Sequence, residues 1–491
     1  MSTSDLRTRP GRTVIIGAGF GGLGMAIALK KAGFDDVLIL EKSQDVGGCW
    51  RENSYPGAAC DVPSHLYSFS FEPNPRWTRK YAPQSEIHAY LQHCARQYGL
   101  MDRTRFGAEV ASLRFLGVED GWEVTLSQGE VLHAQFVISA CGQLSTPQLP
   151  AIEGLSSFKG PQFHSAHWDH GLSLDGLKVA VIGTGASAIQ FIPEVAPKVA
   201  ELTVYQRSAP YVIPKDDRPY TPSETARFTR WPKLQALSRA WIYLTHEARA
   251  LAFTHVPQAM WFVQQSFLRH LRQQVPDPLL RAQLKPDYTV GCKRVLISND
   301  FYPAMARPNV KLVTDAITRV VPEGVVTAGG QLHPADVIIY GTGFAATQFL
   351  TPMKVTGRDG LDLHDVWKRG AQAYLGMTVS GFPNFFMLYG PNTNLGHNSI
   401  VYMLESQIEH ISRCMQAMRN QGVKAIEVPR ARFDQFNDRI TAGLKRTVWA
   451  AGCSSWYQTR DGVNPTNWPG FTFSYRWLTR RADLGDYQVL G

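Results

Sequence analysis

Two glycine-rich loops, each placed between a buried strand and a helix, constrain the fold of this 491-residue chain more than any other feature. In "RTVIIGAGFGGLGMAIALKKAG", an apolar β-branched run leads into Gly17-x-Gly19-x-x-Gly22 and then into a helical pattern. The glycines allow a tight turn and let backbone N–H groups approach a pyrophosphate at the start of the helix. The next strand, "DVLILEK", ends in Glu41, whose carboxylate can accept hydrogen bonds from a ribose 2′-hydroxyl. This unit is therefore predicted to bind a dinucleotide such as FAD.

The signature recurs in "LKVAVIGTGASAIQFIPEVA", where Gly183, Gly185 and Ala188 have the equivalent spacing. The second strand of this unit, "ELTVYQRSAP", ends in Arg207 and Ser208 instead of a carboxylate. A carboxylate would repel a 2′-phosphate, whereas a guanidinium binds it with charge-assisted hydrogen bonds. The second loop is therefore predicted to bind NADPH, with a solvated strand-end charge as the alternative for Arg207. Two dinucleotides in one chain indicate hydride transfer from nicotinamide to flavin.

The length of the chain indicates more than one domain, because a single hydrophobic core does not grow to this size. The predicted fold class is α/β, with two Rossmann-like dinucleotide-binding domains (FAD and NADP) and an inserted helical subdomain. The expected domains are 1–147 with 381–491 for FAD, 148–214 with 292–380 for NADP, and 215–291 for the helical subdomain. The helical subdomain is expected to pack on the NADP unit and line a substrate tunnel. A membrane-surface patch is the alternative, but proline interruptions and the lack of one sustained basic face disfavour it.

The composition of the chain limits which binding partners and which cellular compartment are expected. The net charge of +9 could suit nucleic acid or phosphorylated ligands, but the chain carries no recognised nucleic-acid motif. No apolar run approaches the length of a membrane span, and the first residues lack a signal-peptide core, so a cytoplasmic protein without integral membrane association is predicted. The seven cysteines are scattered and odd in number, which favours reduced thiols over a disulfide framework.

A third motif lies between the two loops, in "FKGPQFHSAHWDH". Its pattern, Phe158-x-Gly160-x-x-x-His164-x-x-x-Trp168-Asp169, resembles the fingerprint of the type I Baeyer–Villiger monooxygenases. The stretch "GGCWRENSYPGAACD" is similar to the other long signature of that family, and "GQLSTPQLP", "IIYGTGF", "GFPNFFMLYGP" and "CSSWY" agree along nearly the whole chain. Many members end the fingerprint in Trp-Pro, whereas this chain has Trp168-Asp169. Aspartate is an accepted variant of the pattern, so the resemblance to the class is unaffected, but an assignment to a subgroup is weaker.

The resemblance implies an activity and two catalytic residues. NADPH reduces FAD, O2 adds at flavin C4a, and the peroxyflavin attacks a ketone to give an ester or a lactone. The catalytic arginine of the family matches Arg294 in "CKRVLISNDFYPAM", and the residue that orients it matches Asp61. This chemistry requires a fixed positive charge in a pocket that excludes water. An arginine there stabilises the negative charge on the peroxide and on the oxygen of the attacked carbonyl without giving up a proton. A salt bridge for Arg294 and a local turn cap for Asp61 are the alternatives.

The cofactor sites expected from the loops and the resemblance contain many residues. For FAD they are Gly17, Gly19, Phe20, Gly22, Glu41, Lys42, Gly48, Trp50, Asp61 and Tyr67. For NADP they are Gly183, Thr184, Gly185, Ala186, Ser187, Gln190, Arg207, Ser208, Lys293 and Trp456. A solvated lysine for Lys293, and core packing for Trp50 and Trp456, remain open.

The histidines of the fingerprint admit three interpretations: a metal site, an acid/base cluster or a hinge. No metal is expected, because a zinc or iron site needs further well-placed ligands. His164 is interpreted as one functional histidine in a hinge with Trp168 as its packing anchor, while His167 and His170 are expected to be incidental. The pair Cys49 and Cys60 is not expected to be redox-active, because disulfide reductases of this architecture use a close Cys-x4-Cys pair.

Three functions remain in competition at this stage. The first is a Baeyer–Villiger monooxygenase that acts on a small-molecule ketone with O2, and that also oxidises sulfides. The second is a flavin-containing heteroatom (S/N) monooxygenase, in which a protonated hydroperoxyflavin acts as the electrophile. The third is a nucleotide-sensing or redox-signalling protein that no organic substrate accelerates. A monomer or small homo-oligomer is expected in each case.

Overall fold

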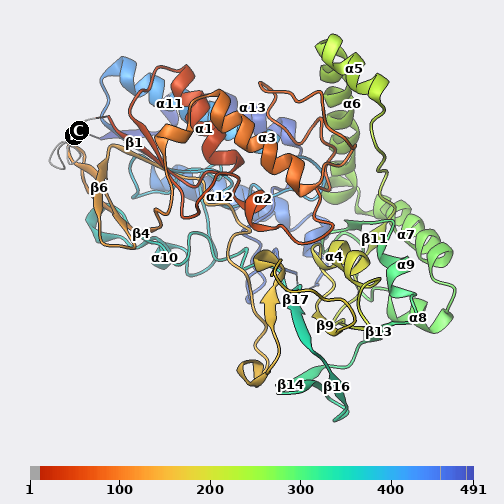
Figure 1. The fold of residues 1–491 in the computed structure, drawn as a ribbon. Coiled ribbons are helices and arrows are strands. Elements are labelled where there is room, and N and C mark those ends of the chain that lie inside the picture. The colour runs from red at the N-terminus through yellow and green to blue at the C-terminus, as the bar shows by residue number, and fades with distance from the viewer. Residues whose placement is uncertain (1–10, 454, 483, 491) are drawn as a thin grey trace.

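The computed structural model describes residues 11–453, 455–482 and 484–490. The first ten residues, which carry part of the argument against a signal peptide, and Ser454 of the "CSSWY" motif lie outside the described residues. The chain forms two five-stranded parallel sheets, and one glycine-rich loop follows a strand of each sheet (Figure 1). The predicted α/β class with two dinucleotide-binding folds is confirmed.

The first sheet has the strand order β19-β7-β1-β2-β3. Its strands are β1 (Thr13–Ile16), β2 (Val37–Leu40), β3 (Thr104–Arg105), β7 (Phe136–Ser139) and β19 (Phe385–Met387). All four pairings are parallel. Helix α1 (Phe20–Lys31) packs against α11 (Ile400–Gln421) and α3 (Gln84–Gln97), and the three helices lie together on one side of this sheet in Figure 1. Covered strands of this kind are apolar throughout, which is why "TVII" and "VLIL" read as buried strands in the sequence.

The second sheet has the order β13-β10-β9-β17-β8. Its strands are β8 (Gln162–His164), β9 (Lys178–Ile182), β10 (Glu201–Tyr205), β13 (Val310–Val313) and β17 (Val337–Tyr340). Helix α4 (Ala188–Val195) follows the second glycine loop and packs on α9 (Phe301–Met305). A small antiparallel sheet, β14 (Ile317–Val321), β15 (Gly324–Thr327) and β16 (Leu332–Pro334), lies beside this unit.

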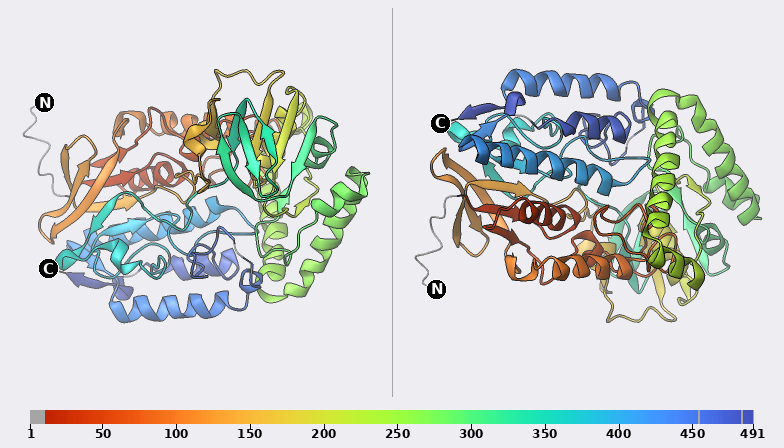
Figure 2. Two further views of the ribbon diagram at one scale, coloured as in Figure 1. Left: turned by 90° about the horizontal axis from the view of Figure 1, so that it is seen from below. Right: turned by 90° about the horizontal axis from the view of Figure 1, so that it is seen from above.

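The predicted helical segment contains four α-helices. They are α5 (Pro222–Arg230), α6 (Pro232–Ala250), α7 (Met260–Gln274) and α8 (Pro278–Gln283), with a π-helical turn at Leu251–His255 after α6. Figure 2 shows these green helices along one end of the molecule, beside both the second sheet and the blue C-terminal helices. Helix α7 contacts the second unit, whereas Arg239 of α6 donates hydrogen bonds to the carbonyls of His65 and Ser68. The segment therefore contacts both units, not only the NADP unit as expected.

One boundary differs from the sequence prediction. Strand β18 (Lys354–Thr356) falls in the stretch assigned to the NADP unit, but it pairs with β4 (Val110–Gly117) in a four-stranded sheet with β5 (Gly121–Leu126) and β6 (Val131–Ala134). Side chains from this stretch, such as Val355 and Leu363, belong to the same hydrophobic core as β1 and α1. The sequence prediction begins the C-terminal part of the FAD unit at residue 381, but β18 already pairs with β4 of the first unit before that position.

The prediction of reduced thiols is wrong for two cysteines. Cys292 and Cys453, which are 161 residues apart in sequence, form a disulfide with a Cα–Cα distance of 6.2 Å. Sequence spacing could not reveal this pair, because only the folding of the C-terminal segment onto the second unit brings the two residues together. Cys49 and Cys60 are outside this disulfide and are not paired with each other. Within the described residues, no helix is both long and apolar enough to cross a membrane.

Candidate active site between the two dinucleotide units

The first glycine loop has a geometry that only glycine tolerates. Gly17 has φ of +103°, and a Cβ there would lie 2.7 Å from the carbonyl oxygen of Ala140. A Cβ on Gly22 would lie 1.8 Å from the carbonyl oxygen of Gly17, so the helix can begin this close to the strand only without side chains. Helix α1 has Gly19 as its N-cap, and no side chain caps it. The N–H groups of its first turn are therefore available to a phosphate.

Glu41 directly follows β2 and is hydrogen-bonded to this loop. It is 5% exposed, and its carboxylate accepts hydrogen bonds from Ala18 N at 2.7 Å and from Ser43 N at 2.9 Å. The carboxylate is thus held beside the glycine loop, where the sequence places it. Lys42 is exposed and pairs with Glu52 at 3.5 Å, so it points away from this position.

Aromatic side chains gather on the neighbouring side of the loop. The ring of Phe20 lies edge-on to that of Tyr67, with centroids 5.2 Å apart, and Trp50 Nε1 donates a hydrogen bond to the Tyr67 hydroxyl at 3.1 Å. A Cβ on Gly48 would lie 3.1 Å from the Cα of Gly19. The structure therefore brings Phe20, Gly48, Trp50 and Tyr67 together next to Gly19.

The second glycine loop is packed against a turn that the sequence also singles out. Gly183 has φ of +108°, and a Cβ there would lie 2.5 Å from the carbonyl oxygen of Gly341, in the "IIYGTGF" motif. Gly185 and Ala186 are exposed, and Thr184 is buried beneath them. Helix α4 begins after Ser187 without a side-chain cap. Ile189 N and Gln190 N already donate to the carbonyls of Gly185 and Ser187, so a phosphate can approach the turn from Gly185 to Ala188 at the start of the helix.

Two cations lie together at the end of β10. Lys293 Nζ donates a hydrogen bond to Ser208 Oγ at 2.9 Å, and it lies 4.3 Å from the centre of the Tyr288 ring. Burial, followed by the positive charge of Arg207, lowers the pKa of Lys293. Neither cation forms an ion pair within the described residues, and Arg207 is exposed. Two neighbouring cations without a carboxylate partner match a dianionic phosphate.

Arg294 and Asp61 form the central ion pair. Arg294 Nη2 donates a hydrogen bond to Asp61 Oδ2, and the two residues are 233 positions apart in sequence. Burial opposes the charge on Asp61, but the guanidinium outweighs it and holds the pKa of the carboxyl below its ordinary value. Asp61 in turn holds the pKa of Arg294 above its ordinary value. The side chains remain 29% and 35% exposed, so a ligand can reach an ionised pair.

Two tyrosines near this pair were not predicted. Burial raises the pKa of Tyr457 to about 12, although the neighbouring charge of Arg294 opposes that shift. Tyr389 has φ of +57°, its hydroxyl donates to Asn394 Oδ1 at 2.7 Å, and Arg294 also opposes the rise in its pKa. Both tyrosines belong to motifs that the sequence singles out, "FFMLYGP" and "CSSWY", so position within those motifs was the available signal. Trp456 is half-buried against Tyr457, with ring centroids 4.4 Å apart.

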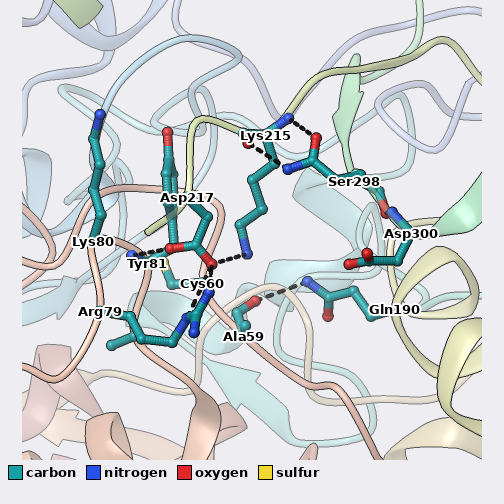
Figure 3. A network of polar contacts seen from close by, with 12 residues as sticks. Ala59, Cys60, Arg79, Lys80, Tyr81, Gln190, Lys215, Asp217, Ser298 and Asp300 are labelled. Carbon is teal, nitrogen blue, oxygen red and sulfur yellow. Dashed lines mark hydrogen bonds and ion pairs between the residues drawn. The ribbon is translucent and has the colours of Figure 1, made fainter. Parts of the chain in front are cut away.

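The "YPGAACD" signature forms the joint between the two units. The hydroxyl of Tyr55 donates to Gln190 Oε1 at 2.9 Å, and Gln190 Nε2 donates to the carbonyl of Ala59 at 2.9 Å. A Cβ on Gly57 would lie 2.5 Å from the backbone carbonyl oxygen of Gln190, so this glycine permits close approach. The signature therefore holds Ala59, two residues before Asp61, against Gln190 of α4 (Figure 3).

A second polar network supports the same joint. Asp217 accepts hydrogen bonds from Arg79 Nε at 3.2 Å and from Tyr81 N at 3.3 Å, and it lies 3.8 Å from Lys215 Nζ (Figure 3). Lys215 in turn exchanges backbone hydrogen bonds with the side chain of Asn299. The segment that contains Arg294 is thereby tied to the first unit at several points.

The fingerprint residues lie in the second unit. Phe158 is buried in its core, and a Cβ on Gly160 would lie 2.1 Å from the carbonyl oxygen of Asp336. His164 ends β8, and its Nδ1 accepts a hydrogen bond from Ala166 N at 3.1 Å. Burial lowers the pKa of His164, so it is neutral at pH 7.

Two other fingerprint positions face the joint. The ring of Trp168 lies 5.4 Å from that of Phe191, which contacts Tyr55 of the first unit. His170 was expected to be incidental, but its Nε2 lies 2.8 Å from Ser54 Oγ, so it also contacts the first unit. Asp169 closes a local turn by accepting from Gly171 N at 2.9 Å. In the part of the chain that the structure describes, no three His, Cys, Asp or Glu side chains gather as metal ligands.

Comparisons with known proteins agree with this geometry. Residues 14–258 match the family described as pyridine nucleotide-disulphide oxidoreductase. The chain is 47% identical to a Baeyer-Villiger monooxygenase of Pseudomonas aeruginosa over 97% of this chain and 91% of that protein. It is 45% identical to a Baeyer-Villiger monooxygenase of Streptomyces coelicolor over 98% and 92%. Among solved structures, OTEMO in complex with FAD and NADP has a TM-score of 0.89 at 29% identity, over 98% of this chain and 100% of that one.

Proposed function

The chain belongs to the Baeyer–Villiger monooxygenases, and from this premise we propose that it binds FAD at the Gly17 loop and NADPH at the Gly183 loop. It is an NADPH-dependent flavoprotein monooxygenase that takes a small-molecule substrate and O2. The reaction we propose inserts one oxygen atom of O2 beside a ketone carbonyl and yields an ester or a lactone. The ion pair of Arg294 and Asp61, placed between the two nucleotide units, is the observation that carries this proposal.

The residues of the first unit fit FAD. The loop at Gly17 and Gly22 has no room for side chains, and the uncapped start of α1 offers N–H groups to a pyrophosphate. Glu41, buried beside the loop, would accept from a ribose hydroxyl, and the aromatic group of Phe20, Trp50 and Tyr67 would border the flavin. Lys42 has the weakest support, because it is exposed and paired with Glu52.

The residues of the second unit fit NADPH. Helix α4 offers its uncapped N–H groups after the Gly183 loop, and Arg207, Ser208 and Lys293 form a cationic end for the 2′-phosphate. Trp456 would contact the ribose from the C-terminal segment. The disulfide between Cys292 and Cys453 supports this placement, because it joins the segment of Lys293 to the segment of Trp456.

Arg294 has the central role in the oxygenating step. Bound FAD would supply the oxygen-transfer chemistry. Arg294 provides a permanent positive charge, since Asp61 holds the pKa of the guanidinium above its ordinary value. That charge stabilises negative oxygen on the reagent and on the attacked carbonyl. Asp61 fixes the orientation of the guanidinium and offsets part of the cost of burying it.

The proposed function is tested by product analysis. Purified protein is incubated with FAD, NADPH and a panel of ketones, and the products are identified by mass spectrometry. Esters or lactones that carry one added oxygen atom are expected, and a thioether is included because the same pocket is proposed to oxidise sulfides. A result with sulfoxide but no ester across the ketone panel would contradict the proposal in favour of a heteroatom monooxygenase.

The domain division that we propose differs from the expected one at a single boundary. Residues 1–147 remain in the FAD unit and 215–291 in the helical subdomain. Residues 349–380 move from the NADP unit to the FAD unit, which the pairing of β18 with β4 and the burial of Val355 support.

A further inference from the structure

Exposed apolar side chains are concentrated at one end of the molecule. Of the twenty large apolar side chains that are exposed among the described residues, twelve lie in residues 231–262 and 473–478. Single exposed apolar residues are ordinary on a protein surface, whereas a contiguous group marks a surface that meets a partner. Six of the twelve form what we call the apolar face: Leu234, Leu237, Trp241 and Leu244 on α6, and Phe473 and Trp477 near the C-terminus.

The outer side of α6 is apolar along most of its length. Its members of the apolar face are spaced by three and four residues, so they lie on one side of the helix. The exposed fractions are 46%, 64%, 70% and 59% for Leu234, Leu237, Trp241 and Leu244. Buried residues such as His246 occupy the opposite side, which packs on the protein. Helix α6 lies along one end of the molecule, so this apolar side faces outward (Figure 2).

Helix α13 (Thr472–Arg480) extends the apolar face beside α6. The hydroxyl of Thr472 and the backbone N–H of Phe473 both donate to the carboxylate of Glu247 in α6, at 2.7 Å and 3.2 Å. Phe473 and Trp477 are 54% and 64% exposed. The two helices are therefore joined directly, and both present large apolar side chains to the solvent.

A groove of about 650 Å³ lies between α11 and α13 at the border of the apolar face. Tyr402, which lines it, stacks on Tyr243 of α6 with ring centroids 4.7 Å apart. One carboxylate in the groove, Glu409, serves several guanidinium groups, which leaves an excess of two positive charges beside two exposed aromatic rings. The residues that set this character are Glu409, Arg413, Arg476, Arg480, Phe473 and Trp477.

The exposed charges around the apolar face have one sign. In residues 231–268 the only carboxylate is Glu247, which is 6% exposed and hydrogen-bonded within the protein. The exposed charged residues of α6 are Lys233 and Arg249, and α13 contains cations but no carboxylate. An anionic partner complements such a surface, whereas a second copy of the same face would bring like charges together.

The residue types indicate the chemistry of the partner. Tryptophan rings favour the headgroup level of a bilayer, leucines favour its acyl chains, and arginines bind lipid phosphates. A surface that combines all three matches the interface of an anionic membrane. A nucleic acid also carries phosphates, but its backbone offers no hydrocarbon to the leucines of α6.

The prolines of the helical segment do not interrupt the apolar face. Pro232 is the first residue of α6, and Pro257 lies beyond the last residue of that helix. The segment itself lacks one sustained basic face, but the folded chain places the arginines of α11 and α13 beside it. Neither feature of the sequence therefore excludes a membrane-surface patch.

We propose that the apolar face and the arginine groove form a peripheral docking surface for an anionic phospholipid bilayer. Helix α6 lies in the plane of the interface, with its leucines and Trp241 toward the acyl chains, while the groove binds lipid phosphates. Binding of this kind combines apolar burial with electrostatic attraction, so it weakens when salt is added or when either part is removed. The inference goes beyond the proposed function and does not depend on the reaction.

The test measures binding of the FAD-loaded protein to lipid vesicles by co-sedimentation. Vesicles of phosphatidylglycerol and phosphatidylcholine in equal amounts are compared with vesicles of phosphatidylcholine alone, at low and high salt. Partition onto the anionic vesicles is expected to be about tenfold stronger or more, and to fall as salt is added. Leu237→Ser/Trp241→Ser should weaken it about tenfold or more through lost apolar area, and Arg480→Gln about fivefold through one lost charge.

Leu332→Ser and Arg114→Gln are the matched controls. Leu332 is a 44% exposed leucine of β16, and the Arg114 side chain on β4 is 58% exposed. Both strands lie away from α6 in Figure 1, so these variants should bind vesicles as the wild type does. If the double variant does not fold, Trp477→Ser on α13 replaces it and should also weaken binding.

Equal binding of the wild type to the two kinds of vesicle would overturn the inference. So would unchanged binding of both the double variant and Arg480→Gln. A wild type that binds no vesicles but forms a dimer in sedimentation velocity, which the double variant loses, would also overturn it and identify the apolar face as a contact between two copies of the chain.

Discussion

Replacement of Arg294 by alanine should slow ester formation strongly while leaving flavin reduction intact. The variant removes the cation that Asp61 holds between the two units, and the Arg294 side chain is 29% exposed in the wild type. A unit charge about 4 Å from a developing negative oxygen contributes ~4 kcal/mol at an effective dielectric constant of about 20. Partial exposure to solvent reduces this to ~2 kcal/mol at the lower end. The expected loss in the rate of ester formation is therefore about 30- to 900-fold.

The assay separates the two half-reactions. Stopped-flow absorbance follows flavin reduction by NADPH without oxygen, and gas chromatography follows the ester when oxygen and ketone are present. Reduction should stay within about threefold of the wild type, a change of less than 1 kcal/mol, because Arg294 is not part of either glycine loop. NADPH that is consumed without ester should appear as hydrogen peroxide. Arg294→Lys is the matched variant, since it keeps a charge but loses the fixed fork of donors, and it should recover only part of the activity.

One result would refute this reasoning. If flavin reduction slows as much as ester formation does, then Arg294 acts in hydride transfer and not in the oxygenating step. Loss of FAD from the variant would also refute it, because Arg294 would then serve flavin binding.

Three further predictions concern other parts of the chain. Arg207→Ala should raise the KM for NADPH about tenfold and leave that for NADH nearly unchanged, because a charge-assisted hydrogen bond contributes about 1.5 kcal/mol or more; equal effects would show that Arg207 does not bind the 2′-phosphate. Thiol titration of the denatured protein should give five thiols before reduction and seven afterwards, because Cys292 and Cys453 are paired; seven thiols before reduction would contradict the disulfide. His246 and His397 have folded-state pKa values of about 4 and 3, below that of an unfolded histidine, so their contribution to stability is present above about pH 6.5 and is lost as the pH falls toward 4. Thermal melts should show this loss, at ~1 kcal/mol per pH unit for each histidine, and a midpoint that stays constant from pH 7 to pH 5 would contradict it.

The glycine loops show how much local sequence can predict. Gly17 and Gly183 each occupy a position with positive φ where a Cβ would collide with a backbone carbonyl, so a glycine had to stand between the strand and the helix. Glu41 directly follows β2 and Arg207 lies two residues after β10, which places each at the carboxyl end of its sheet, where a ribose would lie. Such features depend on neighbours within a few residues, and a sequence pattern therefore reveals them.

Contacts between distant segments could not be predicted from local sequence in this way. The sequence resemblance paired Asp61 with Arg294, but only the folded chain shows the joint that holds them, through Tyr55, Gln190 and the Asp217 network. The disulfide was missed, and the contact of His170 with Ser54 was not predicted, since the two residues are 116 positions apart. The pairing of β18 with β4 was not predicted either, because it joins segments that are far apart in the sequence.

By itself, the sequence determined the class of fold, the two nucleotide units and the family, because each rests on short patterns of backbone conformation and charge. The tertiary structure alone decided which side chains share one buried environment. A buried hydrogen-bonded cluster is the clearest case, since Glu247, Asn398 and Thr472 come from three separate segments. Unpaired polar atoms become costly only when packing removes water from them, and no sequence pattern records that event.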